Sequence, residues 1–205
     1  MKKGKLVVIE GVDGAGKTTQ INKLKEILNP DKNIFLREPG GTKAGLEIRQ
    51  VILDNPLDAK TELLLFYASR NELILKEILP ALKAGKNVVI DRFELSSYAY
   101  QIYGRERPDL KNFIDELSKN IVPENFVDKY YFFDLDVEIS KERERLREKE
   151  SSRFDAEGID FFNKIRQGYK KEIEKYPHKI IDASKTLTEV SDEFLSDIKK
   201  FLLEN

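Results

Sequence analysis

Residues 11–19 have the residue types and spacing of a phosphate-binding loop. Residues 11–18 match the pattern G-x-x-x-x-G-K-[ST] at every required position. Glycines let successive backbone N–H groups point at phosphate oxygens. Lys17 supplies a positive charge for the outer phosphates, and the Thr18 hydroxyl can ligate Mg²⁺. The residues that we predict to hold a nucleoside triphosphate are Gly11, Val12, Asp13, Gly14, Ala15, Gly16, Lys17, Thr18 and Thr19.

A second set of polar residues follows two other short apolar runs. Residues 37–42 read Arg-Glu-Pro-Gly-Gly-Thr, and residues 91–92 read Asp-Arg. If both runs are strands of one parallel sheet, their carboxyl ends meet at the edge where ligands bind in α/β folds. This edge should then form a second anion site. The residues that we expect there are Arg37, Glu38, Pro39, Asp91 and Arg92.

Phe66 and Arg70 are four residues apart on a predicted helix, so the ring and the guanidinium share one face. A planar ring beside an arginine suits a base and its phosphate. Each residue alone has an ordinary structural alternative: Phe66 in the core, Arg70 in a surface ion pair, and Asp91 as a turn cap. Their convergence on one sheet edge favours the binding interpretation.

The elements that would position these residues alternate along the chain. We expect strands at 6–9, 33–37, 88–90, 130–135 and 179–181, a first helix over 17–28, a long helix from residue 60 that Pro80 breaks or bends, and a last helix through 190–201. This order predicts an α/β, three-layer P-loop NTPase fold. Its five-stranded parallel sheet should be covered by helices on both faces, in a single domain spanning residues 1–205.

Composition excludes several classes of protein. The 36 basic and 37 acidic residues leave a net charge of −1, which argues against a dedicated nucleic-acid binder. The absence of cysteine excludes disulfides and thiolate chemistry, and the single histidine, His178, is expected at the surface. No apolar run reaches the roughly 18 residues of a membrane span, so we expect a cytoplasmic protein.

High lysine and glutamate content with no cysteine, no tryptophan and one methionine suggests a thermophile. A melting midpoint in the ordinary mesophile range would count against that hypothesis.

Taken together, the motifs closely resemble the thymidylate kinase (dTMP kinase) family of P-loop nucleoside monophosphate kinases. The resemblance runs in order over nearly the whole chain, and the Arg-Glu-Pro-Gly-Gly-Thr and Asp-Arg-Phe blocks are its most specific parts. The segments that carry it are residues 10–19, 37–42, 65–70, 91–93, 96–101, 135–136, 153–154, 161–162 and 168–169.

The resemblance implies roles at the base and sugar of dTMP. In the family, the residue matching Phe66 stacks on thymine and the residue matching Arg70 helps to read the base. Ser97 and Gln101 match positions that line the thymine. Tyr100 resembles the tyrosine that crowds the sugar 2′ position and thereby favours deoxyribose.

The resemblance also implies roles at the phosphates. Arg92 matches the residue that grips the dTMP phosphate, with Arg37 in support. Glu38 resembles the acidic residue near the sugar and the metal, Asp13 the residue facing the 3′-hydroxyl, and Asp91 the acidic partner of Mg²⁺. Phosphoryl transfer to an anionic oxygen needs positive charge rather than a strong general base. We therefore predict catalysis by Lys17, Arg92 and a mobile arginine.

That mobile arginine is expected in a lid at about residues 140–156, because Ala15 stands where some family members carry an arginine in the loop. Arg153 matches the lid arginine of the family best, and Arg143 and Arg147 are alternatives four residues apart on one helical face. A solvated charged helix is the competing interpretation of this segment.

The predicted activity is transfer of the γ-phosphate of ATP to dTMP, with Mg²⁺, by a homodimer. The nearest alternative is a kinase for another nucleoside monophosphate or a deoxynucleoside. A more distant one is a regulatory protein that hydrolyses ATP as a switch. A GTPase is disfavoured because Asn22-Lys23 is not followed by the x-Asp of the guanine-reading motif.

Overall fold

The computed structural model describes residues 4–146 and 157–203. Within them, one sheet of parallel strands has the order β2-β3-β1-β4-β5. This arrangement confirms the predicted α/β fold with its five-stranded parallel sheet, and every predicted strand is present. The strands are β1 Leu6–Glu10, β2 Asn33–Arg37, β3 Asn87–Asp91, β4 Lys129–Asp134 and β5 His178–Asp182.

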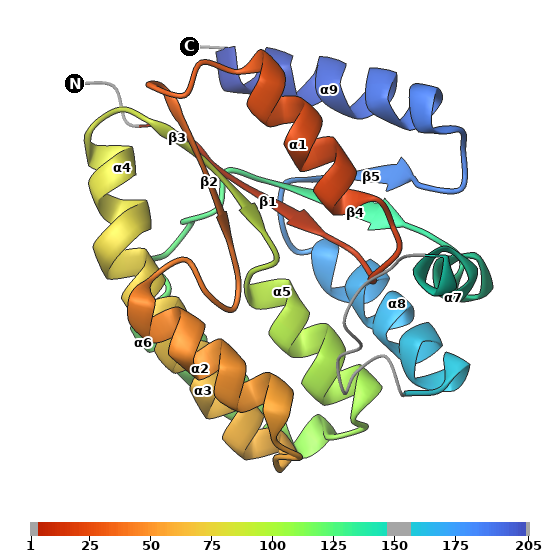
Figure 1. The fold of residues 1–205 in the computed structure, drawn as a ribbon. Helices are drawn as coiled ribbons and strands as arrows, with labels where there is room; N and C mark the ends of the chain where they lie inside the picture. Colours follow the sequence, from red (N-terminus) through yellow and green to blue (C-terminus); the bar gives the residue numbers. More distant parts are fainter. Residues whose placement is uncertain (1–3, 147–156, 204–205) are drawn as a thin grey trace.

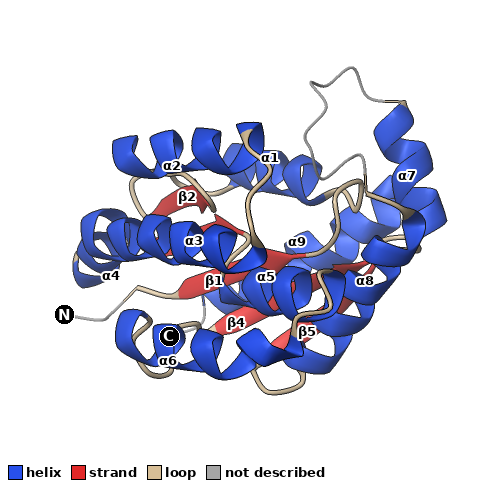
Figure 2. Cartoon of the chain, turned by 90° about the horizontal axis from the view of Figure 1, so that it is seen from below, coloured by secondary structure: helices blue, strands red, loops and turns tan. Residues whose placement is uncertain are grey.

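Helices cover both faces of this sheet. In Figures 1 and 2, α1 and α9 lie on one face, and α5 and α8 lie on the other. None of the described helices is long and apolar enough to cross a membrane. The helices are α1 Lys17–Ile27, α2 Lys43–Asp54, α3 Ala59–Leu73, α4 Leu79–Lys83, α5 Glu94–Ser97, α6 Lys111–Ile121, α7 Val137–Arg145, α8 Ile159–Ile173 and α9 Leu187–Leu203, with π-helical segments η1 Ile74–Ile78 and η2 Tyr98–Gly104 and the 3-10 turn η3 Pro108–Leu110.

The central strand is buried on both faces. All five residues of β1 are buried, which explains why its sequence is a continuous apolar run up to Glu10 rather than an alternating one.

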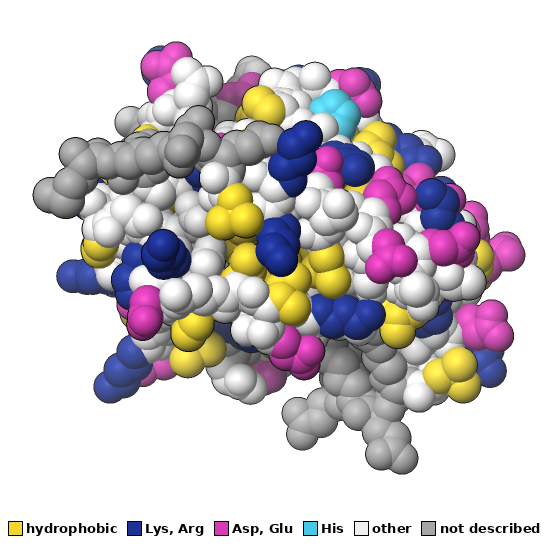
Figure 3. All heavy atoms as spheres, turned by 90° about the horizontal axis from the view of Figure 1, so that it is seen from above, with side chains coloured by type: hydrophobic (Ala, Val, Ile, Leu, Met, Phe, Trp, Pro, Cys, Tyr) yellow, Lys and Arg dark blue, Asp and Glu magenta, His cyan; other side chains and the backbone are white. Residues whose placement is uncertain are grey.

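The molecular surface shown in Figure 3 carries charged residues of both signs, interspersed around a small apolar area. That face therefore carries no large field of a single sign.

Pro80 does not end the long helical stretch as we expected, because the backbone keeps right-handed helical angles at Ile74, Ile78 and Leu79. The α-helix ends at Leu73, the π-helical turns of η1 follow, and α4 begins at Leu79 with Pro80 in its first turn. A π-helical segment inside a helix re-pairs the backbone groups around a residue that lacks an N–H. The change to π-helical geometry follows α3, the helix that carries Phe66 and Arg70.

The polar blocks meet at the carboxyl edge of the sheet. Arg37 pairs in register with Asp91 across β2 and β3, and the backbone N–H of Glu38 donates to the carbonyl of Asp91 at 2.9 Å. The residue after β3, Arg92, donates its N–H to the carbonyl of Ile9, the penultimate residue of β1. The phosphate-loop motif and both arginine blocks therefore lie at one edge.

Candidate active site

The glycine-rich loop joins β1 to α1 and packs against α7. Gly14 has a φ of +79°, and a Cβ there would lie 2.6 Å from the carbonyl oxygen of Ser140. The Ser140 hydroxyl in turn donates to the carbonyl of Asp13 at 2.6 Å. Gly16 caps α1 with a φ of +87° and open space around it, so conformation alone favours glycine there. The motif lies in the strand–loop–helix context that supports a phosphate-binding function.

Lys17 is buried at the start of α1, and its ammonium lies inside the loop. Its Nζ donates to the carbonyls of Gly11 and Val12 at 2.8 and 2.9 Å. Burial, together with repulsion by Arg92, lowers the pKa of Lys17 to about 8, although Asp91 opposes the shift. A lysine with this pKa is mostly charged at neutral pH. It places a cation at the carbonyls of the loop, where the outer phosphates of a triphosphate need positive charge.

Beside the loop lies a pocket that we call the arginine pocket. Every residue predicted to contact the phosphate acceptor lines it. The lining residues are Asp13, Arg37, Glu38, Pro39, Arg49, Ile52, Leu53, Phe66, Arg70, Arg92, Phe93, Ser96, Ser97, Tyr100 and Gln101.

Arg92 connects this pocket to the loop. Its guanidinium donates to Asp13 Oδ1 at 3.0 Å and to the Tyr169 hydroxyl at 2.9 Å. The backbone of Arg92 has a φ of 67°, which is uncommon for a residue with a side chain and costs free energy. Such strain clusters at functional sites, and here it aims the side chain back toward the loop.

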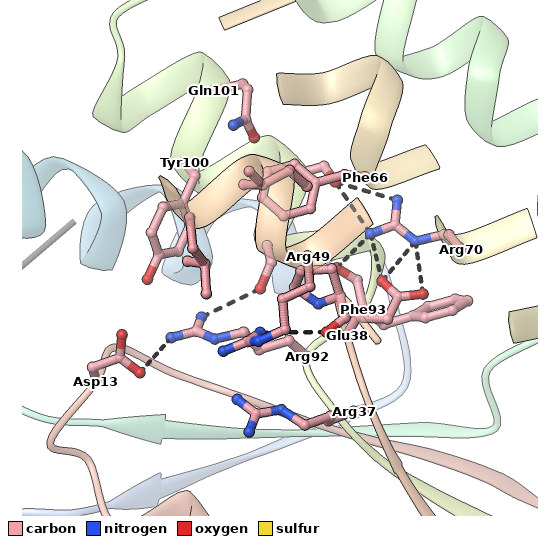
Figure 4. Close-up of a pocket in the computed structure, with 15 residues that line it drawn as sticks. Asp13, Arg37, Glu38, Arg49, Phe66, Arg70, Arg92, Phe93, Tyr100 and Gln101 are labelled. Atoms are coloured by element: carbon pink, nitrogen blue, oxygen red, sulfur yellow. Dashed lines mark hydrogen bonds and ion pairs between the residues drawn. The ribbon is translucent and has the colours of Figure 1, made fainter. Parts of the chain in front are cut away.

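Two further arginines lie at the same end of the pocket. Figure 4 shows the guanidinium groups of Arg37, Arg49 and Arg92 gathered below the rings of Phe66 and Tyr100 in that view. Burial lowers the pKa of Arg49, and repulsion by Arg37 and Arg92 lowers it further. Like charges held this close are stabilised by a bound anion, so this end suits a phosphate group.

Arg49 is a site residue that our sequence reasoning missed. It comes from α2, a helix that we did not predict, and its guanidinium donates to the carbonyl of Pro39 at 3.3 Å. The sequence held a signal for it, because Arg49 lies three residues before Ile52 and four before Leu53, the spacing of one helical face. Ile52 and Leu53 also line the pocket.

The other end of the arginine pocket is apolar with a few hydrogen-bonding groups. Phe66 reaches it from α3, while η2 supplies Tyr100 and Gln101. The Gln101 amide donates to Glu62 at 3.1 Å. Its buried Oε1 has no hydrogen-bond partner among the described residues. Aromatic rings with one available amide acceptor suit a flat base that carries an N–H donor.

Arg70 forms a buried ion pair at the wall of the pocket. Its exposed fraction is 1%, and its Nη2 and Nε atoms donate to Glu38 Oε2 at 2.8 and 2.9 Å. It also donates to the Ser97 hydroxyl and to the carbonyl of Phe93. Burial raises the pKa of Glu38, and the charge of Arg70 opposes that rise. The pair joins the segment after β2 to α3 and α5.

Asp91 is the candidate metal-binding carboxylate. Its Oδ1 is buried and has no hydrogen-bond partner in the part of the chain that the structure describes. No group of three or more His, Cys, Asp or Glu residues could hold a metal within residues 4–146 and 157–203. Mg²⁺ bound with substrate phosphates needs only one or two protein oxygens, so the Asp91 carboxylate and the Thr18 hydroxyl fit that ion.

Glu10 is a second residue that the sequence reasoning left without a role. It is fully buried, and its carboxylate accepts from the backbone N–H of Phe93 at 2.8 Å and from the Ser96 hydroxyl at 2.8 Å. Burial raises its pKa, while Arg92 opposes the rise. These bonds hold the turn that contains Arg92. A charged residue at the end of a buried strand is the signal that could have identified it.

The predicted lid is described only in part. Arg153 and Arg147 lie outside the described residues. At the near end of the lid, Arg143 of α7 donates to the carbonyl of Ala183, just after β5, at 3.0 Å. Arg145, the last residue of α7, is exposed.

Comparisons with known proteins agree on one family. Residues 9–194 match the family model described as Thymidylate kinase. A thymidylate kinase of Thermoanaerobacter sp. (strain X514) is 39% identical over 210 residues, covering 98% of this chain and all of the relative. One from Legionella pneumophila (strain Paris) is 40% identical over 209 residues, covering 98% and 97%. The crystal structure of thymidylate kinase from Ehrlichia chaffeensis superposes with a TM-score of 0.73 at 27% identity, covering 96% of this chain and 99% of that one.

Proposed function

Because this chain belongs to the thymidylate kinase family, we propose that its arginine pocket holds dTMP while the glycine-rich loop holds ATP. The activity is that of a thymidylate kinase, which transfers the γ-phosphate of ATP to dTMP and gives dTDP and ADP. One observation carries the residue assignment. The ion pair between Arg92 and Asp13 joins a pocket with an aromatic end and a three-arginine end directly to the phosphate loop.

In this proposal the arginines hold the acceptor phosphate and orient one of its oxygens toward ATP. Arg92 grips that phosphate, and Arg37 and Arg49 add charge behind it. Lys17 stabilises the negative charge that develops on the transferred group. The attacking oxygen is already anionic, so no residue of the pocket has to remove a proton from it.

Mg²⁺ is part of the proposal, with Thr18 and Asp91 as its protein ligands. When bound, it supplies positive charge to the phosphate oxygens of ATP. The lone buried Oδ1 of Asp91 supports this assignment.

The aromatic end of the pocket is assigned to the nucleoside. Phe66 stacks on thymine, Gln101 and Ser97 line its edge, and Tyr100 lies beside the sugar. Arg70 supports the base site chiefly by fixing Glu38 and Ser97, because its guanidinium donates to both of them. Asp13 faces the sugar 3′-hydroxyl, and Glu38 lies near the sugar and the metal.

Arg153 remains our candidate for the mobile arginine. We expect Arg153→Ala to lower kcat at least tenfold with little change in the affinity for dTMP, because its charge acts on the transferred group. Steady-state kinetics test this, and unchanged turnover would move the role to Arg143 or Arg147.

A single kinase domain over residues 1–205, a homodimer and a cytoplasmic location also remain proposals. Light scattering on the purified protein tests the dimer, since a mass near twice 23.8 kDa is expected. A monomer over the whole concentration range would remove that proposal. Fractionation of the source cells tests the location.

The decisive experiment is an acceptor panel. Purified protein with ATP and Mg²⁺ is incubated with dTMP, dUMP, dCMP, dGMP, UMP or AMP, and each diphosphate is quantified. A Lys17→Met variant purified in parallel measures contaminating kinases. We expect strong preference for dTMP. Preference for another monophosphate would retain the reaction type and overturn the nucleoside assignment, whereas ATP hydrolysis without any phosphorylated acceptor would indicate a switch.

A further inference from the structure

A second pocket lies on the same face of the sheet as α5 and α6. Its volume is about 790 Å³, within the range of small-molecule sites. It is formed by the start of α5, the carboxyl end of α6 with the loop up to Asp128, the first part of β4, and the turn that precedes β5. None of its lining residues lines the arginine pocket.

Two buried polar groups on the wall of this second pocket are unpartnered. The exposed fraction of Glu94 is 7%, and its carboxylate forms no hydrogen bond or ion pair with the described residues. Tyr130 is fully buried, and its hydroxyl likewise has no partner among them. By contrast, the buried carboxylates of Glu10, Glu38 and Glu62 all accept hydrogen bonds. Unpartnered buried groups destabilise a fold, so a ligand that satisfies the Glu94 carboxylate is a physical reason to keep it.

The rest of the wall suits an organic cation. The rings of Tyr130 and Tyr176 lie 5.2 Å apart, and Phe126 adds a third, nearly buried ring. Aromatic faces around a carboxylate attract a cation, whereas they would repel an anion. Of the two lysines on the wall, Lys175 is already paired with Glu172 and Lys119 is exposed on α6.

We propose that the second pocket binds a small organic cation, an ammonium or amidinium group carried on an apolar body. Glu94 accepts the hydrogen bonds of the charged group, and the ring of Tyr130 forms part of the wall beside it. Tyr176 and Phe126 enclose the apolar body. This site is separate from the phosphotransfer site, and it does not depend on which nucleotide the arginine pocket takes.

Benzamidine is the probe that tests the proposal, with benzamide as its neutral counterpart of the same shape. Isothermal titration is done with saturating dTMP present, so that the arginine pocket is filled. We expect benzamidine to bind the wild-type protein and benzamide to bind at least tenfold more weakly. Glu94→Gln should weaken benzamidine binding at least tenfold. Asp31→Asn, which removes an exposed carboxylate outside both pockets, should leave it unchanged.

A stability measurement separates a binding role from a structural one. Glu94 has no hydrogen bond or ion pair and only a longer-range attraction to Arg70, so Glu94→Gln should melt close to the wild-type temperature. Tyr130→Phe, which keeps the ring and removes a hydroxyl without a partner, should do the same. Absence of benzamidine binding up to its solubility limit would overturn the proposal. So would equal binding of benzamide, undiminished binding by Glu94→Gln, or a Glu94→Gln melting temperature far below that of the wild type.

Discussion

The Arg70–Glu38 pair allows one prediction to be worked out in energetic terms. Arg70→Met keeps most of the length of the side chain but leaves the Glu38 carboxylate, 4% exposed, without its cation. Breaking a buried pair from one side costs about 3–5 kcal/mol. At 1.4 kcal/mol for each factor of ten, the ratio of folded to unfolded protein should fall by between a hundredfold and several thousandfold. For a chain of this size the melting temperature should fall by roughly 6–20 °C.

The double variant Arg70→Met/Glu38→Leu separates a desolvated charge from lost packing. Replacing both partners with apolar side chains is often nearly neutral, so the double variant should recover at least half of the loss. Urea unfolding measures the free energy of unfolding of the wild type and of each variant. Arg107→Ala, which removes an exposed partner of Asp109, is the matched control and should not change the urea midpoint measurably. A double variant as unstable as the sum of the single variants would refute the reasoning.

The stability of the Arg70→Met variant should also depend on pH, and the sign of that dependence follows from the pKa of Glu38. Burial raises the pKa of Glu38 above its ordinary value of 4.5, and without Arg70 nothing offsets that rise. A carboxyl group with a raised folded pKa contributes stability that is complete below pH 4.5 and is lost as the pH climbs through the raised value. Arg70→Met should therefore show a higher urea midpoint at pH 5 than at pH 8, relative to the wild type.

Three further predictions concern the phosphate loop and the arginine end of the pocket. Burial holds the pKa of Lys17 near 8, so kcat/KM for ATP should decline above about pH 8 as the lysine loses its charge; a profile flat to pH 10 would contradict this. Arg49→Met should raise the KM for dTMP at least tenfold, whereas Lys43→Met, an exposed change on the same helix, should not, as initial-rate kinetics will show. Gly14→Ala should lower the melting temperature and kcat/KM for ATP because its Cβ meets the α7 backbone at 2.6 Å, whereas Gly158→Ala, at a φ of −73° in open space, should leave both unchanged.

The edge of the sheet that binds ligands could be predicted from the sequence, because the apolar pattern of each strand indicates how deeply it is buried. A continuous apolar run that ends in a polar turn indicates a strand covered on both faces, and all parallel carboxyl ends lie on one side. In the structure Arg37 lies in register with Asp91 at that edge. The spacing of Phe66 and Arg70 on one helical face also predicted two side chains that line one pocket. The Arg70 guanidinium there pairs with Glu38, which the spacing did not indicate.

The residues that were missed depend on features that periodicity does not encode. The apolar face of α2 is blurred because Leu46 and Val51 are 56% and 45% exposed, so the helix carrying Arg49 gave a weak signal. The π-helical turns of η2 shift which side chains share a face, and a period of 3.6 residues cannot show how Tyr100 and Gln101 reach the pocket. The pairing of Arg70 with Glu38 spans 32 residues and requires the order of the strands to be known.

Asp13 occupies a position with thermodynamic consequences for how the two substrates bind. Its carbonyl accepts a hydrogen bond from Ser140 of α7, and its carboxylate accepts one from Arg92 of the arginine pocket. Asp13 thus lies beside the sites of both ATP and dTMP. If either ligand shifts Asp13 when it binds, the contacts available to the other ligand change. Such coupling is reciprocal: whatever factor ATP applies to the affinity for dTMP, dTMP must apply to the affinity for ATP. Replacing the Asp13 side chain should diminish that cooperativity in both directions by the same factor.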